Sequence, residues 1–345
     1  MRNAINRQVR MAARPVGAPK DSDFRLVESE MPVPGADEML VRVIYLSLDP
    51  YFRGRMNDGP SYAAPMQIDD VMIGRTVSQV VESNLDGYAP GDFVFCDPVG
   101  WQEYGIVRSD ALGLRKLDPA IAPISTALGV LGMPGFTAWY GLLELGKPKA
   151  GETVVVSAAA GAVGSLVGQI AKIKGCRAIG IAGAQEKCDF VVRELGFDAC
   201  VSHHSDTLLA DLKGECPKGI DVYFENVGGK VFEAVFPQMT LFSRLVLCGQ
   251  ISQYNATARP EGPGASLIMG LIGRRMTASG FVIGDHRDRF DEFQDEVAGW
   301  IRAGKVRFRE DIAMGLENAA GAFQGLLEGR NFGKQLVQIG DDPTR

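Results

Sequence analysis

Short stretches rich in β-branched and aromatic residues recur through the first third of the chain. They are Met39–Leu48, Val77–Glu82, Phe93–Cys96 and Trp101–Val107, and Gln8–Val16 precedes them as a candidate first strand. Turn residues such as Pro34-Gly35 and Pro90-Gly91-Asp92 separate the stretches. Runs of this length bounded by Gly and Pro are typical of strands joined by turns. We therefore predict a compact β-barrel or a distorted sheet here, and not a parallel sheet.

The pattern changes at Thr153, where strand and helix signals begin to alternate. Apolar residues recur at steps of three and four after the strand core Val154–Val156, at Val163, Leu166, Val167, Ile170 and Ile173. That spacing marks one buried face of a helix. The strands expected next are Ala178–Ile181, Ala199–Val201, Val222–Phe224 and Arg244–Leu247, with helices at Glu186–Leu195, Asp206–Lys213 and Lys230–Phe236. This alternation predicts an α/β fold with a doubly wound parallel sheet.

The C-terminal part of the chain is less regular. We predict a flexible loop at Gly262–Ser266 and an amphipathic helix at Phe290–Ile301. Lys305–Glu310 and Gln335–Ile339 have strand-like sequences and are expected to rejoin the first domain. A length of 345 residues suits two domains.

Composition narrows the class of protein. The chain has 36 Lys and Arg residues and 42 Asp and Glu residues, which gives a formal net charge of -6, and 46% of its residues are hydrophobic. These values argue against a disordered chain and against a nucleic-acid partner. No apolar run reaches the roughly 18 residues that span a bilayer, so no membrane partner is expected. The opening MRNAINRQVRMAARPVG lacks a signal-peptide core, which favours the cytoplasm, although its lack of acids leaves a transit peptide open.

The cysteines and histidines give no metal or disulfide signature. Six cysteines are scattered without C-x-x-C spacing, which favours free thiols in a reducing compartment. The three histidines are His203, His204 and His286, and none pairs with a cysteine at the spacing of zinc ligands. We therefore expect chemistry that does not depend on a metal.

A glycine-containing turn joins the first strand of the alternating region to its helix. Its residues, Ala159 to Gly164, form the variant dinucleotide fingerprint A-x-G-x-x-G. Gly161 would let the backbone approach a pyrophosphate, and Gly164 would let the helix pack closely on the strand. The helix N-terminus offers N–H groups and a positive dipole end to that anion. Tight packing alone could also explain the small residues, but the order strand, turn, helix is the context that the motif demands.

The end of the next strand indicates which dinucleotide binds. An NAD site expects an acidic residue there, bonded to the ribose 2′-OH. The sequence instead reads Ile181-Ala182-Gly183-Ala184, and Lys187 follows on the first turn of a helix. A missing acid and a nearby cation favour NADP(H). Glu186 is the counter-argument, but at a helix start it suits the dipole.

With these residues in place, the sequence resembles the zinc-independent prostaglandin reductase, leukotriene dehydrogenase and curcumin reductase group of the medium-chain dehydrogenase/reductases. The resemblance rests on Leu46–Met56, Gly132–Ser165, Gly219–Gly229, Cys248–Asn255 and Gly329–Lys334. It implies a GroES-like catalytic domain over 1–126, completed by about 307–345, and a Rossmann NADP-binding domain over 127–306. Zinc alcohol dehydrogenases carry Cys and Gly-His-Glu where this chain has Asp49-Pro50-Tyr51 and Ile73-Gly74-Arg75-Thr76.

The resemblance implies hydride transfer from NADPH to the β-carbon of an α,β-unsaturated ketone or aldehyde. Negative charge then develops on the carbonyl oxygen, so a hydrogen-bond donor there stabilises the transition state. The resemblance gives this role to Tyr254, whose alternative is a loop aromatic that only packs. It implies that Tyr51 lines the substrate cleft, whose alternative is packing within the barrel.

The resemblance also implies a set of coenzyme contacts. These are Gly161, Ala162, Val163, Gly164, Lys187, Asn226, Cys248, Gly249, Ile251, Ser252, Tyr254, Asn331 and a strand made of Phe281, Val282 and Ile283. Asn226 could instead be an Asx-turn residue. Many relatives carry Tyr where this chain has His203, so we hypothesise that His203 contacts the 2′-phosphate, the alternative being an exposed histidine pair.

Other functions on this scaffold stay open. A quinone or alcohol oxidoreductase would use the same coenzyme on a different substrate. A non-enzymatic NADP-binding protein would keep the glycine turn without needing Tyr254. A homodimer is what the resemblance implies for assembly.

Overall fold

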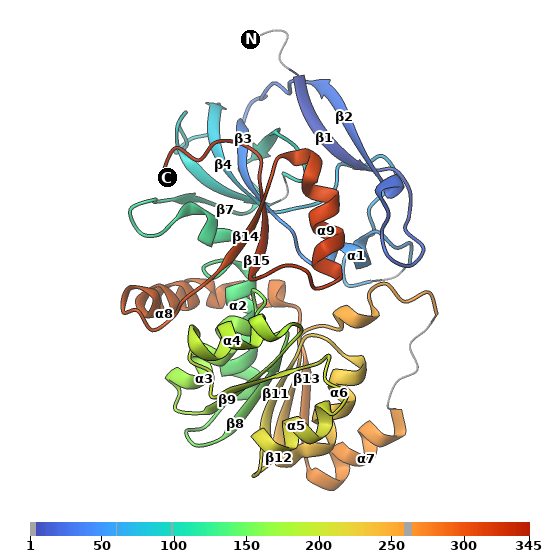
Figure 1. Cartoon of the computed structure of the whole chain (residues 1–345). Helices are drawn as coiled ribbons and strands as arrows, with labels where there is room; N and C mark the ends of the chain where they lie inside the picture. Colours follow the sequence, from blue (N-terminus) through green and yellow to red (C-terminus); the bar gives the residue numbers. More distant parts are fainter. Residues whose placement is uncertain (1–4, 60, 98, 259–263) are drawn as a thin grey trace. The chain divides into compact units, whose positions relative to one another are not determined.

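The computed structural model describes residues 5–345 except 60, 98 and 259–263, and the chain divides into two units (Figure 1). The first unit runs to Leu128 and also contains Glu310–Asn331 and Gln335–Arg345. The second unit contains Gly129–Arg309 and Phe332–Lys334. The C-terminal segment therefore returns to the unit in which the chain begins.

The first unit is built on a seven-stranded sheet in the order β14-β15-β3-β4-β5-β7, with β6 paired to β3. Its strands are β3 (Glu38–Ser47), β4 (Thr76–Ser83), β5 (Phe93–Asp97), β6 (Tyr104–Arg108), β7 (Leu112–Leu117), β14 (Glu310–Met314) and β15 (Lys334–Gln338). β3 pairs antiparallel with β4 on one edge, and on the other its two halves pair with β6 and β15. Each of these pairings is antiparallel, as expected for a region without a parallel sheet.

Among the residues that the structure describes, this unit also contains a two-stranded ladder and two α-helices. β1 (Ile5–Met11) pairs antiparallel with β2 (Phe24–Glu30), and the helices are α1 (Phe52–Arg55) and α9 (Ala319–Leu327). Phe323 of α9 packs edge-on against the fully buried Trp101, with ring centres 5.8 Å apart. The C-terminal segment thus supplies part of the core of the first unit.

The second unit contains a six-stranded parallel sheet in the order β10-β9-β8-β11-β12-β13. Its strands are β8 (Thr153–Ser157), β9 (Arg177–Ala182), β10 (Ala199–Ser202), β11 (Ile220–Glu225), β12 (Met239–Leu247) and β13 (Thr277–Gly280). Numbered along the chain, this order is 3-2-1-4-5-6, the doubly wound order of dinucleotide-binding domains. The predicted parallel sheet is confirmed.

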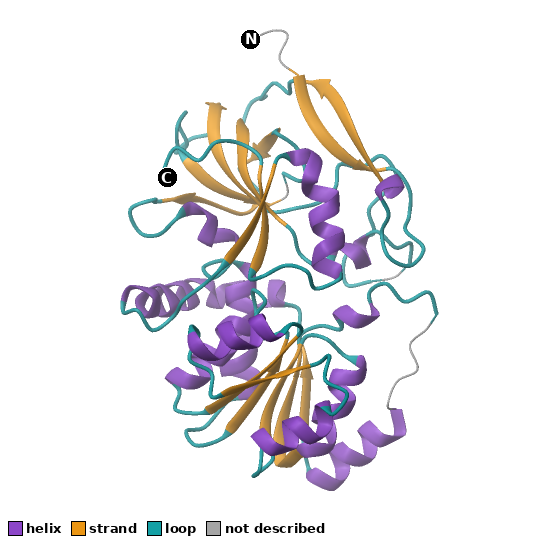
Figure 2. Ribbon diagram, viewed as in Figure 1, coloured by secondary structure: helices purple, strands orange, loops and turns teal. Residues whose placement is uncertain are grey.

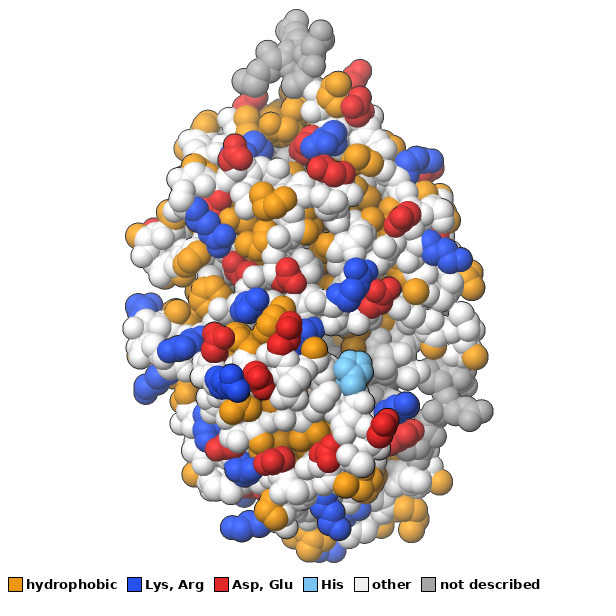
Figure 3. All heavy atoms as spheres, viewed as in Figure 1, with side chains coloured by type: hydrophobic (Ala, Val, Ile, Leu, Met, Phe, Trp, Pro, Cys, Tyr) orange, Lys and Arg blue, Asp and Glu red, His pale blue; other side chains and the backbone are white. Residues whose placement is uncertain are grey.

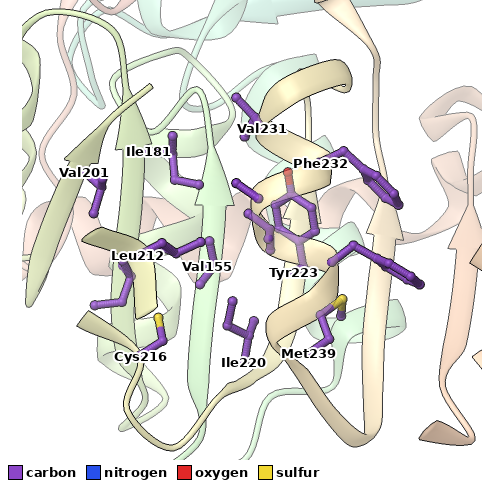
Figure 4. Close-up of a cluster of buried hydrophobic side chains, with 14 of the residues drawn as sticks. Val155, Ile181, Val201, Leu212, Cys216, Ile220, Tyr223, Val231, Phe232 and Met239 are labelled. Atoms are coloured by element: carbon purple, nitrogen blue, oxygen red, sulfur yellow. The ribbon is translucent and has the colours of Figure 1, made fainter. Parts of the chain in front are cut away.

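Helices cover both faces of this sheet (Figure 2). They are α2 (Met133–Tyr140), α3 (Gly164–Ile173), α4 (Gln185–Arg193), α5 (Leu208–Glu215), α6 (Gly229–Val235), α7 (Gly264–Arg274) and α8 (Phe290–Arg302). With both faces covered, the central strands are apolar throughout, as in the fully buried Val154, Val155 and Val156. Figure 4 shows the core on one face, where Val155 and Tyr223 of the sheet lie beside Val231 and Phe232 of α6.

Three expectations about local structure away from the candidate site were wrong. Gly264–Ser266 begin helix α7 and are not a loop, while Gly262 and Pro263 lie outside the described residues. Lys305–Arg309 are irregular, and the strand β14 begins only at Glu310. The first strand ends at Met11, because the chain turns there and residues 12–16 do not pair with β2.

Candidate coenzyme and active site

The residues predicted to bind coenzyme in the second unit follow the carboxyl ends of its parallel strands. The glycine turn follows β8, Lys187 lies shortly after β9, His203 follows β10, Asn226 follows β11 and Cys248 follows β12. In doubly wound sheets the carboxyl edge, near the change in strand order, is where ligands bind. The sheet therefore gathers residues from five separate segments at one edge.

The glycine turn after β8 is packed tightly against its own backbone. A Cβ at Gly164 would lie 2.3 Å from the Ala158 carbonyl oxygen, so only glycine fits where α3 begins. A Cβ at Gly161 would lie 3.2 Å from the same oxygen, with no other atom within 4 Å. Gly161 also forms a parallel bridge with Gly333. The exposed side of Gly161 is thus open to an approaching ligand, next to the N-terminus of α3 and its dipole.

Basic side chains follow the next two strands. His203 donates its backbone N–H to Ala182 at the end of β9 (2.8 Å), and its ring centre lies 4.3 Å from that of His204. Burial, His204 and Lys187 together lower the pKa of His203 below its ordinary value of 6.5. A Cβ at Gly183, just after β9, would lie 3.4 Å from His204 Nε2 and 3.5 Å from His203 Cε1, so both rings lie beside the end of that strand. His204, which sequence reasoning left without a role, belongs to the same group.

Asn226 is held by a buried polar network beneath the sheet edge. Its backbone N–H donates to Ser157 Oγ and its side-chain amide to the Ser157 carbonyl, both at 2.8 Å. Ser157 Oγ donates in turn to Glu225 Oε1 (2.7 Å), and Glu225 also accepts from the Tyr223 hydroxyl and the Val227 N–H. Glu225 is only 1% exposed. The network joins the carboxyl ends of β8 and β11 and fixes the orientation of the Asn226 side chain.

The loop after β12, Cys248–Tyr254, is fastened to the turn after β11. Ile251 and Ser252 donate their N–H groups to the carbonyls of Asn226 (3.1 Å) and Val227 (3.0 Å). The Tyr254 hydroxyl would lie 3.1 Å from a Cβ at Gly249, so the phenol reaches over the start of its own loop. Gly249, with no side chain, leaves room for that hydroxyl. Burial and Glu225 raise the pKa of the Cys248 thiol to about 12, so it stays protonated and is no nucleophile.

Two of the predicted coenzyme contacts remain to be placed. The segment Phe281–Ile283 has a different structure from the one expected, and Asn331 lies in the first unit. Phe281, Val282 and Ile283 do not form a strand: β13 ends at Gly280, Phe281 and Val282 follow it, and Ile283 begins a 3₁₀ helix, η6 (Ile283–Arg289). The predicted role of these residues is compatible with that position, at the carboxyl end of the last strand. Asn331 is half-buried and belongs to the first unit, in the segment between α9 and β15.

Tyr51 lies in the first unit beside an ion-pair cluster that sequence reasoning missed. Arg75 donates to the Tyr51 hydroxyl (3.2 Å), and its Nε lies 2.9 Å from Asp97 Oδ2. Asp49, which is 3% exposed, lies on the other side of Arg75 and accepts from Ser47 Oγ at 2.7 Å. Across the described residues, no three His, Cys, Asp or Glu side chains are grouped closely enough to hold a metal ion.

The carboxyl edge of the second unit fits a phosphorylated dinucleotide. The glycine turn and the N-terminus of α3 suit a pyrophosphate, and Lys187 with His203 suits a second phosphate. The acidic Glu225 is buried under the edge and engaged by three donors, so it presents no free carboxylate to a ribose. Fold and site therefore define a dinucleotide-binding protein built on two units.

Comparison with known proteins gives the family. Residues 7–116 match the family described as "N-terminal domain of oxidoreductase", and residues 162–299 match the one described as "Zinc-binding dehydrogenase". The chain is 50% identical over 341 residues to the NADPH-dependent curcumin reductase of Escherichia coli, covering 98% of each chain. It is 42% identical to the 2-alkenal reductase (NADP(+)-dependent) of Nicotiana tabacum, covering 97% of each chain. The chain therefore belongs to the medium-chain dehydrogenase/reductases, in their zinc-independent group.

Solved structures agree with this assignment. CurA from Vibrio vulnificus in complex with NADPH has a TM-score of 0.93 and 50% identity, over 97% of this chain and 100% of that one. The expected fold, a GroES-like domain and a Rossmann domain, is confirmed by this likeness.

Proposed function

We propose that this protein is an NADPH-dependent reductase of the C=C bond of α,β-unsaturated ketones and aldehydes, acting without a metal. The observation that carries the proposal is the Tyr254 hydroxyl, a hydrogen-bond donor positioned at the same strand ends as the residues that suit the coenzyme. The similarity to curcumin, 2-alkenal and prostaglandin reductases along nearly the whole chain supports the choice of reaction.

The second unit is proposed to hold NADP(H) at its carboxyl edge. Gly161, Ala162, Val163 and Gly164 would receive the pyrophosphate, and Lys187 and His203 the 2′-phosphate. Asn226, the loop residues Cys248, Gly249, Ile251 and Ser252, the segment Phe281–Ile283 and Asn331 would contact the rest of the coenzyme. When bound, NADPH supplies the hydride that adds to the β-carbon of the substrate.

Tyr254 is the proposed catalytic residue. A phenol has an ordinary pKa of about 10, so at neutral pH it keeps its proton and donates it in a hydrogen bond. Its acceptor here would be the substrate carbonyl oxygen, whose negative charge grows as the C=C bond is reduced. A donor to that oxygen binds the transition state more strongly than the ground state, and thereby lowers the barrier.

A panel of enones assayed with NADPH and with NADH tests this function. We expect NADPH oxidation with 3-nonen-2-one and with 2-alkenals, and the saturated carbonyl compound as product. Tyr254→Phe should lower kcat about 10²-fold while NADPH binding is retained. Formation of the allylic alcohol, or turnover of quinones and no enone, would contradict the proposal.

We also propose that the protein is a homodimer formed through its second unit. α7 has no buried residue, and Ile268, Met269 and Ile272 on it are 59%, 68% and 67% exposed. These three side chains recur at spacings that place them on one face of the helix. β13 is the outer strand of the parallel sheet, and an unpaired strand edge is a ready site for pairing with a second copy.

The domain roles and the location of the protein are proposed on simpler grounds. We assign substrate binding, beside Tyr51, to the first unit, which corresponds to the GroES-like catalytic domain, and we assign coenzyme binding together with Tyr254 to the second unit. No helix among the described residues is both long and apolar enough to cross a membrane. The six cysteines suit a reducing compartment, which supports a cytoplasmic location; cell fractionation tests it.

A further inference from the structure

The ion-pair cluster of the first unit consists of Arg75, Asp49 and Asp97. Its geometry indicates a role in addition to packing. Arg75 immediately precedes β4, Asp49 follows β3 and Asp97 ends β5. Because β4 pairs with both β3 and β5, the Arg75 side chain lies between the two carboxylates. One carboxylate oxygen lies 2.9 Å from Nε and the other 4.0 Å from a terminal nitrogen. The guanidinium is thus held from two sides, and its side chain is only 20% exposed.

The terminal nitrogen of Arg75 that lies nearest to Asp49 is also directed at Tyr51. A terminal N–H of Arg75 donates to the Tyr51 oxygen at 3.2 Å. A guanidinium has donors only, so the phenol must be the acceptor of this bond. The Tyr51 proton is then left to point away from Arg75. Within the described part of the chain, the recorded hydrogen bonds give that proton no acceptor.

We propose that Arg75 is a positioning residue that makes Tyr51 a fixed hydrogen-bond donor to the carbonyl oxygen of the substrate. The inference rests on the proposed function, because it needs a substrate that carries such an oxygen. Asp97 and Asp49 hold Arg75, Arg75 occupies an acceptor site of the phenol, and the phenol proton is directed to the ligand.

The charges around Tyr51 agree with this role. Burial raises the pKa of the Tyr51 phenol, as do Asp49, Asp97 and Tyr62, whereas the Arg75 cation alone opposes them. The net direction is upward, so the hydroxyl keeps its proton throughout the neutral range. Tyr51 therefore acts as a neutral donor and not as a phenolate.

A double-mutant cycle tests the proposal. Wild type, Arg75→Lys, Tyr51→Phe and the double variant are compared in kcat and KM for 3-nonen-2-one at saturating NADPH. Lysine keeps the charge but cannot bond Asp97 and Tyr51 together as the guanidinium fork does. We expect each single change to lower kcat/KM about tenfold, mostly through kcat, and the double variant to be no worse than Tyr51→Phe. NADPH binding should be unchanged in all four proteins.

A matched control uses the exposed ion pair of Arg25 with Asp69 in the same unit. Arg25→Lys makes the same chemical change far from Tyr51 in sequence and should leave kcat/KM unaltered. Thermal unfolding of every variant shows whether it folds. If Arg75→Lys does not, the cycle is repeated with Asp97→Asn, which removes the charge that holds Arg75 Nε, and the same non-additive pattern is expected.

The outcomes separate the two hypotheses. Losses that multiply in the double variant, or an Arg75→Lys variant as active as wild type, would overturn the role of Arg75 and leave the reductase function standing. Wild-type protein that binds NADPH but reduces no enone would overturn the proposed function, and this inference with it.

Discussion

The buried carboxylate of Glu225 stabilises the site from below. It accepts hydrogen bonds from Ser157, Tyr223 and the Val227 N–H, and Tyr223 is fully buried. Glu225→Ala would leave the Tyr223 hydroxyl and the Val227 N–H without this acceptor, and would leave Ser157 only a 3.5 Å contact with the Phe224 carbonyl. We therefore expect it to lower the free energy of unfolding by about 2–4 kcal/mol. Urea denaturation measures the loss.

The matched control is Glu233→Ala, on the exposed face of α6. It should change the free energy of unfolding by no more than about 0.5 kcal/mol. Equal stability of the Glu225 and Glu233 variants would mean that the network contributes nothing to the fold.

At His203 we predict a dependence of coenzyme affinity on pH. Its pKa lies below 6.5 in the free protein, so the imidazole is neutral at pH 7. A bound 2′-phosphate favours the imidazolium form, because the opposite charges attract. NADPH should therefore bind more tightly as pH falls below about 6.5. Dissociation constants from pH 5.5 to 8.5 test this for wild type and His203→Ala.

NADH is the control ligand for this measurement, since it lacks the 2′-phosphate. Its dissociation constant should vary little over the same range. If the NADPH profiles of wild type and His203→Ala coincide, His203 makes no contact with the phosphate and the exposed-pair interpretation is correct.

At the scale of single elements, we expect the two glycines at the junction of β8 and α3 to have different roles: Gly164 is needed for folding, and Gly161 is needed for coenzyme binding. A Cβ at Gly164 would overlap the Ala158 carbonyl at 2.3 Å, whereas one at Gly161 would meet it at 3.2 Å. We expect Gly164→Ala to displace the start of α3 and to destabilise the protein by more than about 2 kcal/mol. Gly161→Ala should fold nearly normally but bind NADPH about tenfold more weakly, because the methyl group stands where the pyrophosphate approaches.

Gly214→Ala in α5 is the control, since a Cβ there meets nothing within 4 Å. It should retain NADPH affinity and unfold at the same temperature or slightly higher. Thermal unfolding and NADPH titration of the three variants test the distinction. Unchanged NADPH affinity in Gly161→Ala would remove the turn from the proposed site.

The elements also show what could be predicted from sequence. Strands such as Val154–Val156 were predictable because a buried parallel strand is apolar at every position. β13 was not, since Thr277–Gly280 is a short edge strand of small residues with no such signal. α7 was not predicted at all, because Gly264-Ala265-Ser266 has loop-like composition and the apolar residues that follow are exposed instead of marking a buried face.

The candidate site likewise has one part that the sequence could predict and one part that it could not. Local order, a strand followed by a turn and a helix, predicted the glycine turn and the coenzyme class. The contact of Arg75 with Tyr51 joins residues 24 positions apart and depends on how β3 and β4 pair. A sequence pattern records no such register, so the cluster could be found only in the structure.

At the scale of the whole molecule, charge does not single out a polymeric partner. The net charge is -6, and Figure 3 shows acidic and basic side chains interspersed over the visible face. Such a surface suits a small neutral ligand better than a polyanion. The proposed association of two copies would therefore use apolar surface, such as the exposed side chains of α7.

We predict that Ile268→Lys together with Ile272→Lys converts the dimer into monomers. Both side chains are more than half exposed in the single chain, so the lysines cost little there. In a dimer each isoleucine would be buried, at about 1.5–3 kcal/mol apiece, so the dimer dissociation constant should rise at least about a hundredfold. Light scattering during gel filtration measures the mass.

The control is Val33→Lys with Ile121→Lys, at two exposed apolar positions of the first unit, which should leave the dimer intact. A monomeric wild type at micromolar concentration, or dissociation in both double variants, would show that α7 is not the dimer surface.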